Sequence, residues 1–136
     1  MQERPIDIVI IGSGSAGLNA MAQARAAGRS FVLINGGEPG TTCARIGCMP
    51  SKVMIRIAEE YYRRTHFGQF GIDGHQGLRL DVTEAMKHVQ ELRDGFVHGV
   101  VSRSTANLPD DVFIQDYARL VEPTLVEAGG QRFRAK

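Results

Sequence analysis

The only two cysteines of the chain, Cys43 and Cys48, lie in one short segment that continues into Pro50-Ser51-Lys52. Residues five positions apart in a regular α-helix point about 140° away from each other, because the helix has 3.6 residues per turn. A bond between the two sulfurs therefore needs a distorted backbone, which Gly47 and Pro50 can supply and fix. We interpret the cysteines as a redox pair, because a disulfide that closes so short a loop gains little stability and is easily reduced.

Two other interpretations of the cysteines stay open. The pair could be an inert bridge or two unreactive thiols, or it could belong to a zinc site. A zinc site needs further ligands, and the histidines of the chain show no ligand spacing with the cysteines or with each other. We assign no role to these histidines, His66, His75, His88 and His98, and expect no metal site.

A β-turn-α-β pattern precedes the cysteines. Ile6 to Ile11 is a short apolar run, interrupted only by Asp7, and is typical of a strand buried on both faces. After a glycine-rich turn, an alanine-rich stretch predicts a helix through Ala27, and Gly28 supplies its end. Phe31 to Ile34 is a second buried strand, so the unit has about the length expected of such a motif.

The turn itself reads Gly12-Ser13-Gly14-Ser15-Ala16-Gly17. In this pattern the first glycine permits a tight turn, the second lets a pyrophosphate approach the backbone, and the third lets helix pack on strand. The anion would lie at the helix N-terminus, which favours negative charge. The turn therefore predicts dinucleotide binding, and a purely structural glycine turn is the alternative. At the end of the second strand Asn35 replaces the usual ribose-binding carboxylate, and an amide can still hydrogen-bond one hydroxyl.

The rest of the chain predicts helices and then short strands. Helical spacing covers Val53 to Arg64, and residues 65–80 read as a connection. Asp81 and Glu84 suit a capping box for a helix whose broad apolar stripe, running to Val101, must pack on protein or on a partner subunit. Beyond it, Gly129-Gly130 suits a hairpin turn between Thr124–Val126 and Arg132–Ala135.

Composition bounds the function classes. The chain has 136 residues, of which 43% are hydrophobic and 23% charged, with a net charge of +1, as in an ordinary soluble domain. No basic stripe argues for nucleic acid or an anionic membrane, and no apolar run is long enough to span a bilayer. The N-terminus enters a strand without a signal sequence, so we expect a cytoplasmic location.

The glycine unit followed by Thr41 to Lys52, which reads Thr-Thr-Cys-Ala-Arg-Ile-Gly-Cys-Met-Pro-Ser-Lys, resembles the class I pyridine nucleotide-disulfide oxidoreductases. The segment is most similar to the dihydrolipoamide dehydrogenase branch. It departs from the family pattern at Thr41, where glycine is usual, and at Ala44-Arg45, where Leu-Asn or Val-Asn is common. The resemblance covers nearly the whole chain, as the N-terminal part of an FAD-binding domain.

The resemblance implies a flavoprotein in which NAD(P)H reduces FAD, and FAD exchanges electrons with a Cys43–Cys48 disulfide. Cys43 would be the outward-facing interchange thiol, Cys48 the thiol packed against the flavin, and Lys52 a cation near the reactive flavin edge. Asn35 would contact the adenosine ribose. The implied cofactor-binding residues are Gly12, Ser13, Gly14, Ser15, Ala16, Gly17, Asn35, Gly36, Gly37, Thr42, Cys43, Cys48, Lys52 and Ala118.

The expected fold is α/β: a Rossmann-like FAD-binding domain with a parallel sheet, incomplete, with a β-hairpin or meander near the C-terminus. We expect residues 1–136 to be the N-terminal part of that domain, with the nicotinamide-binding and dimerisation domains absent from this chain. The full-length protein would be a homodimer that acts in cell redox homeostasis on a small-molecule or lipoyl-type dithiol. The alternatives are an isolated FAD- or nucleotide-binding module without turnover, or a glutathione- or mercuric-reductase-like enzyme.

Overall fold

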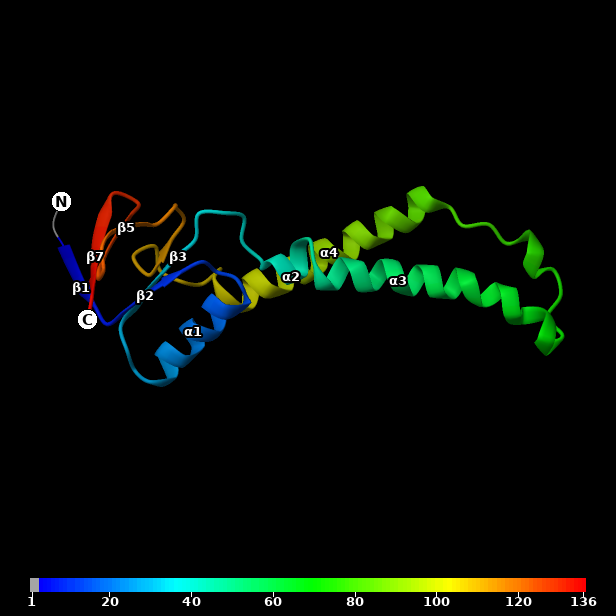
Figure 1. Ribbon diagram of the computed structural model, residues 1–136, viewed down its shortest axis with the longest axis horizontal. Coiled ribbons are helices and arrows are strands. Elements are labelled where there is room, and N and C mark those ends of the chain that lie inside the picture. Colours follow the sequence, from blue (N-terminus) through cyan, green and yellow to red (C-terminus); the bar gives the residue numbers. More distant parts are fainter. Residues whose placement is uncertain (1–2) are drawn as a thin grey trace. The chain divides into compact units, whose positions relative to one another are not determined.

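The computed structural model describes residues 3–136, which form two compact units (Figure 1). The first unit contains the residues up to Thr42 together with His98–Lys136, and the second contains Cys43–Val97. Along the chain, the second unit is thus an insertion between two strands of the first. None of the helices among residues 3–136 is long and apolar enough to cross a membrane.

A parallel sheet forms the centre of the first unit. Its strands, in the order β2-β3-β4, are β2 (Ile8–Ile11), β3 (Phe31–Ile34) and β4 (Phe113–Ile114). The central strand is fully buried from Val32 to Ile34, which is why its sequence is continuously apolar. Helix α1 (Ser15–Ala26) joins β2 to β3 and buries Met21 and Ala24 beside the sheet. The predicted β-turn-α-β unit is confirmed.

The expected single strand Ile6–Ile11 is two strands. β1 (Glu3–Ile6) and β2 are separated at Asp7, and they belong to different sheets. The Asp7 carboxylate accepts hydrogen bonds from the Ser30 N–H at 2.9 Å and from the Ser30 hydroxyl at 2.6 Å, while the Asp7 N–H donates to that hydroxyl. These polar contacts take Asp7 out of the ladder, so the prediction of one strand was wrong at this residue.

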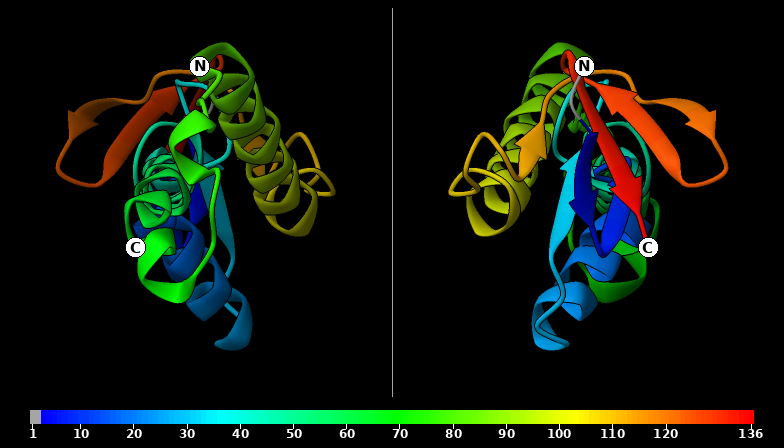
Figure 2. Two further views of the ribbon diagram at one scale, coloured as in Figure 1. Left: turned by 90° about the vertical axis from the view of Figure 1, so that its right-hand side faces the viewer. Right: turned by 90° about the vertical axis from the view of Figure 1, so that its left-hand side faces the viewer.

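The second sheet of the first unit has the order β1-β7-β6-β5. Its other members are β5 (Arg119–Glu122), β6 (Leu125–Ala128) and β7 (Gln131–Ala135). β6 and β7 form the predicted hairpin, whose turn residues Gly129 and Gly130 have positive φ angles of 56° and 69°. Figure 2 shows β1 and β7 side by side, as their parallel pairing requires. Phe133 of β7 is fully buried in the core that both sheets share.

Two helices dominate the second unit. After the short helix α2 (Thr42–Arg45), the chain forms α3 (Cys48–Arg63), two 3-10 segments (Arg64–Phe70 and His75–Gly77) and α4 (Val82–Ser104), which continues past the boundary with the first unit. α3 begins at Cys48 rather than at the predicted Val53. Asp81 caps α4 as predicted, accepting from the Thr83 and Glu84 amides at 2.9 and 3.1 Å.

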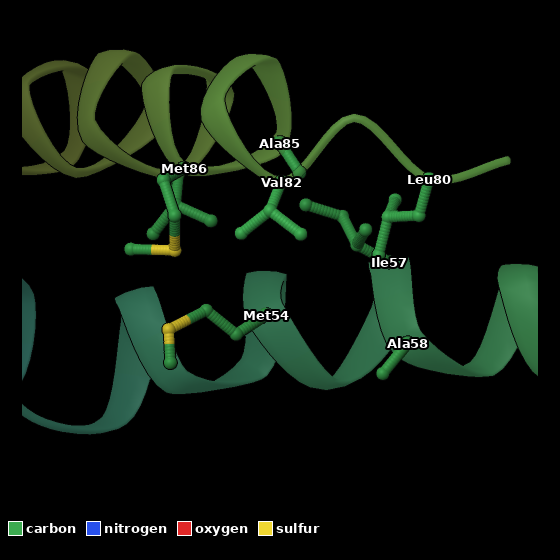
Figure 3. Close-up of a pocket in the computed structure, with 8 residues that line it drawn as sticks. Met54, Ile57, Ala58, Leu80, Val82, Ala85 and Met86 are labelled. Atoms are coloured by element: carbon green, nitrogen blue, oxygen red, sulfur yellow. The ribbon is translucent and has the colours of Figure 1, made fainter.

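The facing sides of α3 and α4 are apolar. Figure 3 shows Met54 and Ile57 of α3 and Val82 and Met86 of α4 pointing into one shared pocket. Val89 is buried there, whereas Met54 and Met86 stay 43% and 40% exposed. The predicted apolar stripe of α4 therefore packs on protein in part.

Candidate functional site

The glycine-rich turn has the geometry that its three glycines predict. Gly12 has a φ of +96°, and its N–H donates to the Ile34 carbonyl at 2.7 Å. A Cβ built on Gly17 would lie 1.8 Å from the Gly12 carbonyl oxygen, so helix and turn approach too closely for any side chain. A Cβ built on Gly14 would have nothing within 4 Å, which leaves the backbone open to an approaching ligand.

The start of α1 is suited to an anion. Gly14 is the N-cap and offers no side-chain hydrogen bond, and the first turn of α1 contains no acidic residue. The first hydrogen bond within α1 runs from the Leu18 N–H to the Gly14 carbonyl at 2.9 Å. The backbone N–H groups before Leu18 are therefore those that a helix leaves for an acceptor outside it. An open backbone at Gly14 and a helix start without a carboxylate fit the pyrophosphate of a dinucleotide.

The side chain of Asn35 connects the two loops that follow β2 and β3, at the carboxyl edge of the parallel sheet. Its Oδ1 accepts a hydrogen bond from the Ser13 N–H at 3.1 Å, and its Nδ2 donates to the Gly37 carbonyl. An amide oxygen has a second lone pair and an amide nitrogen a second N–H, so the side chain keeps capacity for a ribose hydroxyl. Asn35 is therefore first a residue that positions the glycine turn, and its ribose contact stays a prediction.

Two residues that the sequence did not single out complete this edge. Gln115 donates from Nε2 to the Gly37 carbonyl at 2.8 Å, and the ring of Tyr117 lies against Gly36. The predicted Ala118 is partly buried and packs against the core. For Tyr117, the available signal was an aromatic residue in the polar segment that follows the apolar pair Phe113-Ile114.

The cysteine pair lies in the second unit, at a break between two helices. α2 ends at Arg45 and α3 begins at Cys48, and the intervening Gly47 has the non-helical angles φ −119° and ψ −114°. The break brings the two sulfurs into a thiol–thiol hydrogen bond, in agreement with the predicted backbone distortion. Both cysteines are free thiols in the structure.

The two thiols differ in acidity. The hydrogen bond from the Cys43 thiol lowers the pKa of Cys48, and the backbone amide of Cys48 and the charge of Lys52 act in the same direction. The same contact raises the pKa of Cys43. Cys48 is therefore the more acidic thiol of the pair, with Cys43 as its hydrogen-bond donor. Lys52 is held on this turn of α3, donating from Nζ to the Cys48 carbonyl at 3.5 Å.

The two thiols also differ in exposure. Cys48, which opens α3 together with the exposed first-turn residues Ser51 and Lys52, is exposed, and Cys43 is partly buried. The expected roles, Cys43 as the outward-facing thiol and Cys48 as the thiol against the flavin, stay predictions.

The residues just before the pair are strained. Thr41 has a φ of +61° and is the one non-glycine residue with positive φ among residues 3–136. A β-branched residue is disfavoured in this region of the backbone map. The conformation explains why glycine is usual at this position. The next residue, the predicted Thr42, is exposed and begins α2.

Comparisons with known proteins give the same picture. The model of the pyridine nucleotide-disulphide oxidoreductase family matches residues 6–126. Mercuric reductase of Lysinibacillus sphaericus is 30% identical over 139 residues, covering 100% of this chain and 24% of the relative. Mercuric reductase of Serratia marcescens is 46% identical over 108 residues, covering 76% of this chain and 24% of the relative. Dihydrolipoyl dehydrogenase of Pseudomonas aeruginosa is 29% identical, covering 85% of this chain and 25% of the relative.

A solved structure shares the fold. The Cu(II) complex of RclA, a HOCl-induced flavoprotein disulfide reductase from Escherichia coli, superposes with a TM-score of 0.72 at 20% identity, covering 97% of this chain and 27% of that chain. The chain thus spans about a quarter of the length of the relatives it matches. Because the family model covers most of its residues, the chain belongs to the pyridine nucleotide-disulphide oxidoreductase family, whose members use FAD and NAD(P)H.

Proposed function

We propose that this chain carries the FAD-binding and dithiol part of an oxidoreductase that passes electrons between NAD(P)H, FAD, the Cys43–Cys48 pair and a dithiol or disulfide substrate. The observation that carries the proposal is the break between α2 and α3 at Gly47, which brings the two thiols together and makes Cys48, next to Lys52, the more acidic of them. FAD, when bound, supplies the two-electron exchange between the nicotinamide and the cysteine pair.

In this proposal the first unit binds the dinucleotide. The open backbone at Gly14 and the first amides of α1 receive the pyrophosphate. Asn35 fixes the turn through Ser13 and offers its second lone pair to the ribose. Thr42, Gly36, Gly37 and Ala118 are proposed as further cofactor contacts.

The unequal acidity of the thiols supports distinct roles for them. In the oxidised pair, a substrate thiolate attacks one sulfur and expels the other as a thiolate. The thiol with the lower pKa is the better leaving group, so attack falls on Cys43 and releases Cys48. A second substrate thiolate then displaces Cys43, which leaves a substrate disulfide and the reduced pair. Lys52 stabilises the Cys48 thiolate by its charge.

The substrate that we propose is a dihydrolipoamide-type dithiol, on the residues that match that branch in the cysteine segment. Mercuric ion is the second candidate, because a mercuric reductase shares 46% identity over 108 residues. NAD(P)H oxidation by the FAD-loaded full-length protein, with lipoamide or with Hg(II), separates the two. FAD binding by the full-length protein without turnover on either substrate would favour the alternative of a binding module. We propose a homodimer for the full-length protein, which its mass in solution would test.

Binding of FAD by the purified chain is the direct test of the first unit. Titration of the chain into FAD should quench flavin fluorescence and red-shift the flavin absorbance, with one FAD per chain. FMN, which lacks the adenosine half, should compete poorly. A chain that leaves the spectrum of added FAD unchanged would contradict the proposal.

A further inference from the structure

Tyr117 is an exposed aromatic side chain in the first unit. Its exposed fraction is 78%, the highest among the large apolar and aromatic side chains of residues 3–136. It lies just after β4, in the first unit. No role in cofactor binding follows for it from the glycine pattern or from the cysteine segment.

The backbone at Tyr117 is fixed by its neighbour Asp116. One carboxylate oxygen of Asp116 accepts from the Tyr117 N–H at 2.8 Å, and the other accepts from the Gly129 N–H at 2.7 Å. The Asp116 N–H in turn donates to the Ile114 carbonyl at 3.1 Å. The exposed ring is therefore attached to an ordered turn, between the end of β4 and the β6–β7 hairpin.

The ring is also held from one side. A Cβ built on Gly36 would lie 2.4 Å from Cδ1, 2.5 Å from Cγ and 2.8 Å from Cε1 of Tyr117. Three ring atoms thus cover the place where any other residue would have its side chain. The loop beneath is tied to β4 by the hydrogen bond from Gln115 to the Gly37 carbonyl. Gly36 is the residue that lets the ring settle on this loop.

The position of the ring points to a nucleotide base. Ligands of parallel α/β sheets bind beyond the carboxyl ends of the strands. The glycine turn follows β2, the Asn35–Gly37 loop follows β3, and Tyr117 follows β4, so all three lie at that edge. A fixed aromatic face that water reaches is a surface on which a base can stack.

We propose that Tyr117 is a positioning residue whose ring stacks on the adenine of the bound dinucleotide. The inference rests on the proposed function, because it takes the first unit to bind FAD. Tyr117, which lies outside the glycine turn, is then a determinant of the preference for adenine nucleotides. Gly36 supports that determinant by leaving room for the ring.

The test measures binding of ADP and of FAD by isothermal titration calorimetry. Tyr117→Leu fills the same place over Gly36 without an aromatic face, and it should weaken both ligands by about 5- to 150-fold, as expected for the loss of one stacked base. Tyr117→Phe keeps the face and should bind both ligands within about twofold of the original chain. Circular dichroism spectra and thermal melts check that each variant is folded.

Tyrosine emission gives a second readout, because the chain contains no tryptophan and three tyrosines. ADP should quench part of this emission in the original chain, and the quenching should disappear in Tyr117→Phe although ADP still binds. Equal affinities of the original chain and folded Tyr117→Leu would overturn the stacking role and leave the proposed function intact. A chain that binds neither FAD nor ADP would overturn the proposed function itself.

Discussion

The side-chain oxygen of Asn35 accepts a hydrogen bond from the main-chain N–H of Ser13 at 3.1 Å. This bond joins the end of β3 to the glycine-rich turn that follows β2. Ser13 is 4% exposed, so little water could reach its N–H if the Asn35 oxygen were removed. The residue that replaces the usual ribose-binding carboxylate is thus a part of the fold as well as a candidate ligand.

Asn35→Ala should therefore lower the free energy of unfolding by about 1–3 kcal/mol, because it leaves a buried N–H without its acceptor. Asn35→Asp keeps the acceptor and loses the donor to the Gly37 carbonyl, so its free energy of unfolding should lie between those of the original chain and Asn35→Ala. Asn19→Ala, on the exposed face of α1, is the matched control and should change stability by less than about 0.5 kcal/mol. Urea unfolding followed by circular dichroism measures all three, and an unchanged midpoint for Asn35→Ala would contradict the account.

Gly17 and Gly14 should respond to alanine in different ways. A Cβ at position 17 would lie 1.8 Å from a backbone oxygen, so Gly17→Ala should cost more than about 3 kcal/mol and reduce the yield of folded protein. A Cβ at position 14 meets nothing within 4 Å, so Gly14→Ala should fold with a stability change below about 1 kcal/mol. It should nevertheless weaken FAD binding by at least about tenfold, because the methyl group occupies the approach of the pyrophosphate.

Thermal melts and fluorescence titration with FAD measure these two effects separately. Full FAD affinity in Gly14→Ala would place the pyrophosphate away from this turn. A fully stable Gly17→Ala would show that helix α1 and the turn do not approach as closely as the structure has them.

Thr41 should be a site where glycine stabilises the chain. Its φ of +61° strains a β-branched residue, and Thr41→Gly should raise the free energy of unfolding by about 1 kcal/mol after the entropy cost of glycine. Thr41→Val keeps the branched side chain and should give no gain. A melting temperature of Thr41→Gly at or below that of Thr41→Val would argue against a left-handed backbone at this position.

The thiols should titrate in a fixed order. Because the pKa of Cys48 is lowered and that of Cys43 raised, iodoacetamide should modify Cys48 first at neutral pH, and Cys43 should follow only as the pH rises. Peptide mapping by mass spectrometry after timed alkylation, from pH 6 to pH 10, separates the two cysteines.

Lys52→Met should move the alkylation profile of Cys48 to higher pH, because it removes a cation that lowers this pKa. Lys87→Met is the matched control, since Lys87 pairs with Glu84 on α4 and should leave the profile unchanged. Faster alkylation of Cys43 than of Cys48 at neutral pH would reverse the assignment of the thiolate.

Local patterns were sufficient for the β-turn-α-β unit and for the hairpin. The apolar run at Phe31–Ile34, the three glycines and Gly129-Gly130 each specify backbone geometry within a few residues. The break at Asp7 depends instead on Ser30, a partner that no local pattern connects to it. The run Ile6–Ile11 alone therefore predicts one strand where there are two.

In the candidate site too, local features could be predicted and contacts between distant segments could not. The distorted backbone between the cysteines could be predicted, because the spacing and Gly47 require it. The bond between Asn35 and Ser13, and the ring of Tyr117 over Gly36, join loops from different strands. Such contacts follow from the folded topology and have no periodicity in the sequence. The positive φ of Thr41 opposes the local preference of a β-branched residue, so the residue type gives no indication of this backbone conformation.

An anaerobic titration of the FAD-loaded chain with dithiothreitol tests the central claim, which is that Cys48 faces the flavin as the thiolate of a redox pair. Two-electron reduction should produce a long-wavelength absorbance band from the contact of thiolate and flavin. Cys48→Ser should bind FAD and lack the band, whereas Cys43→Ser should show it without reductant. A chain that binds FAD but gives no band, or a band that survives in Cys48→Ser, would contradict the account.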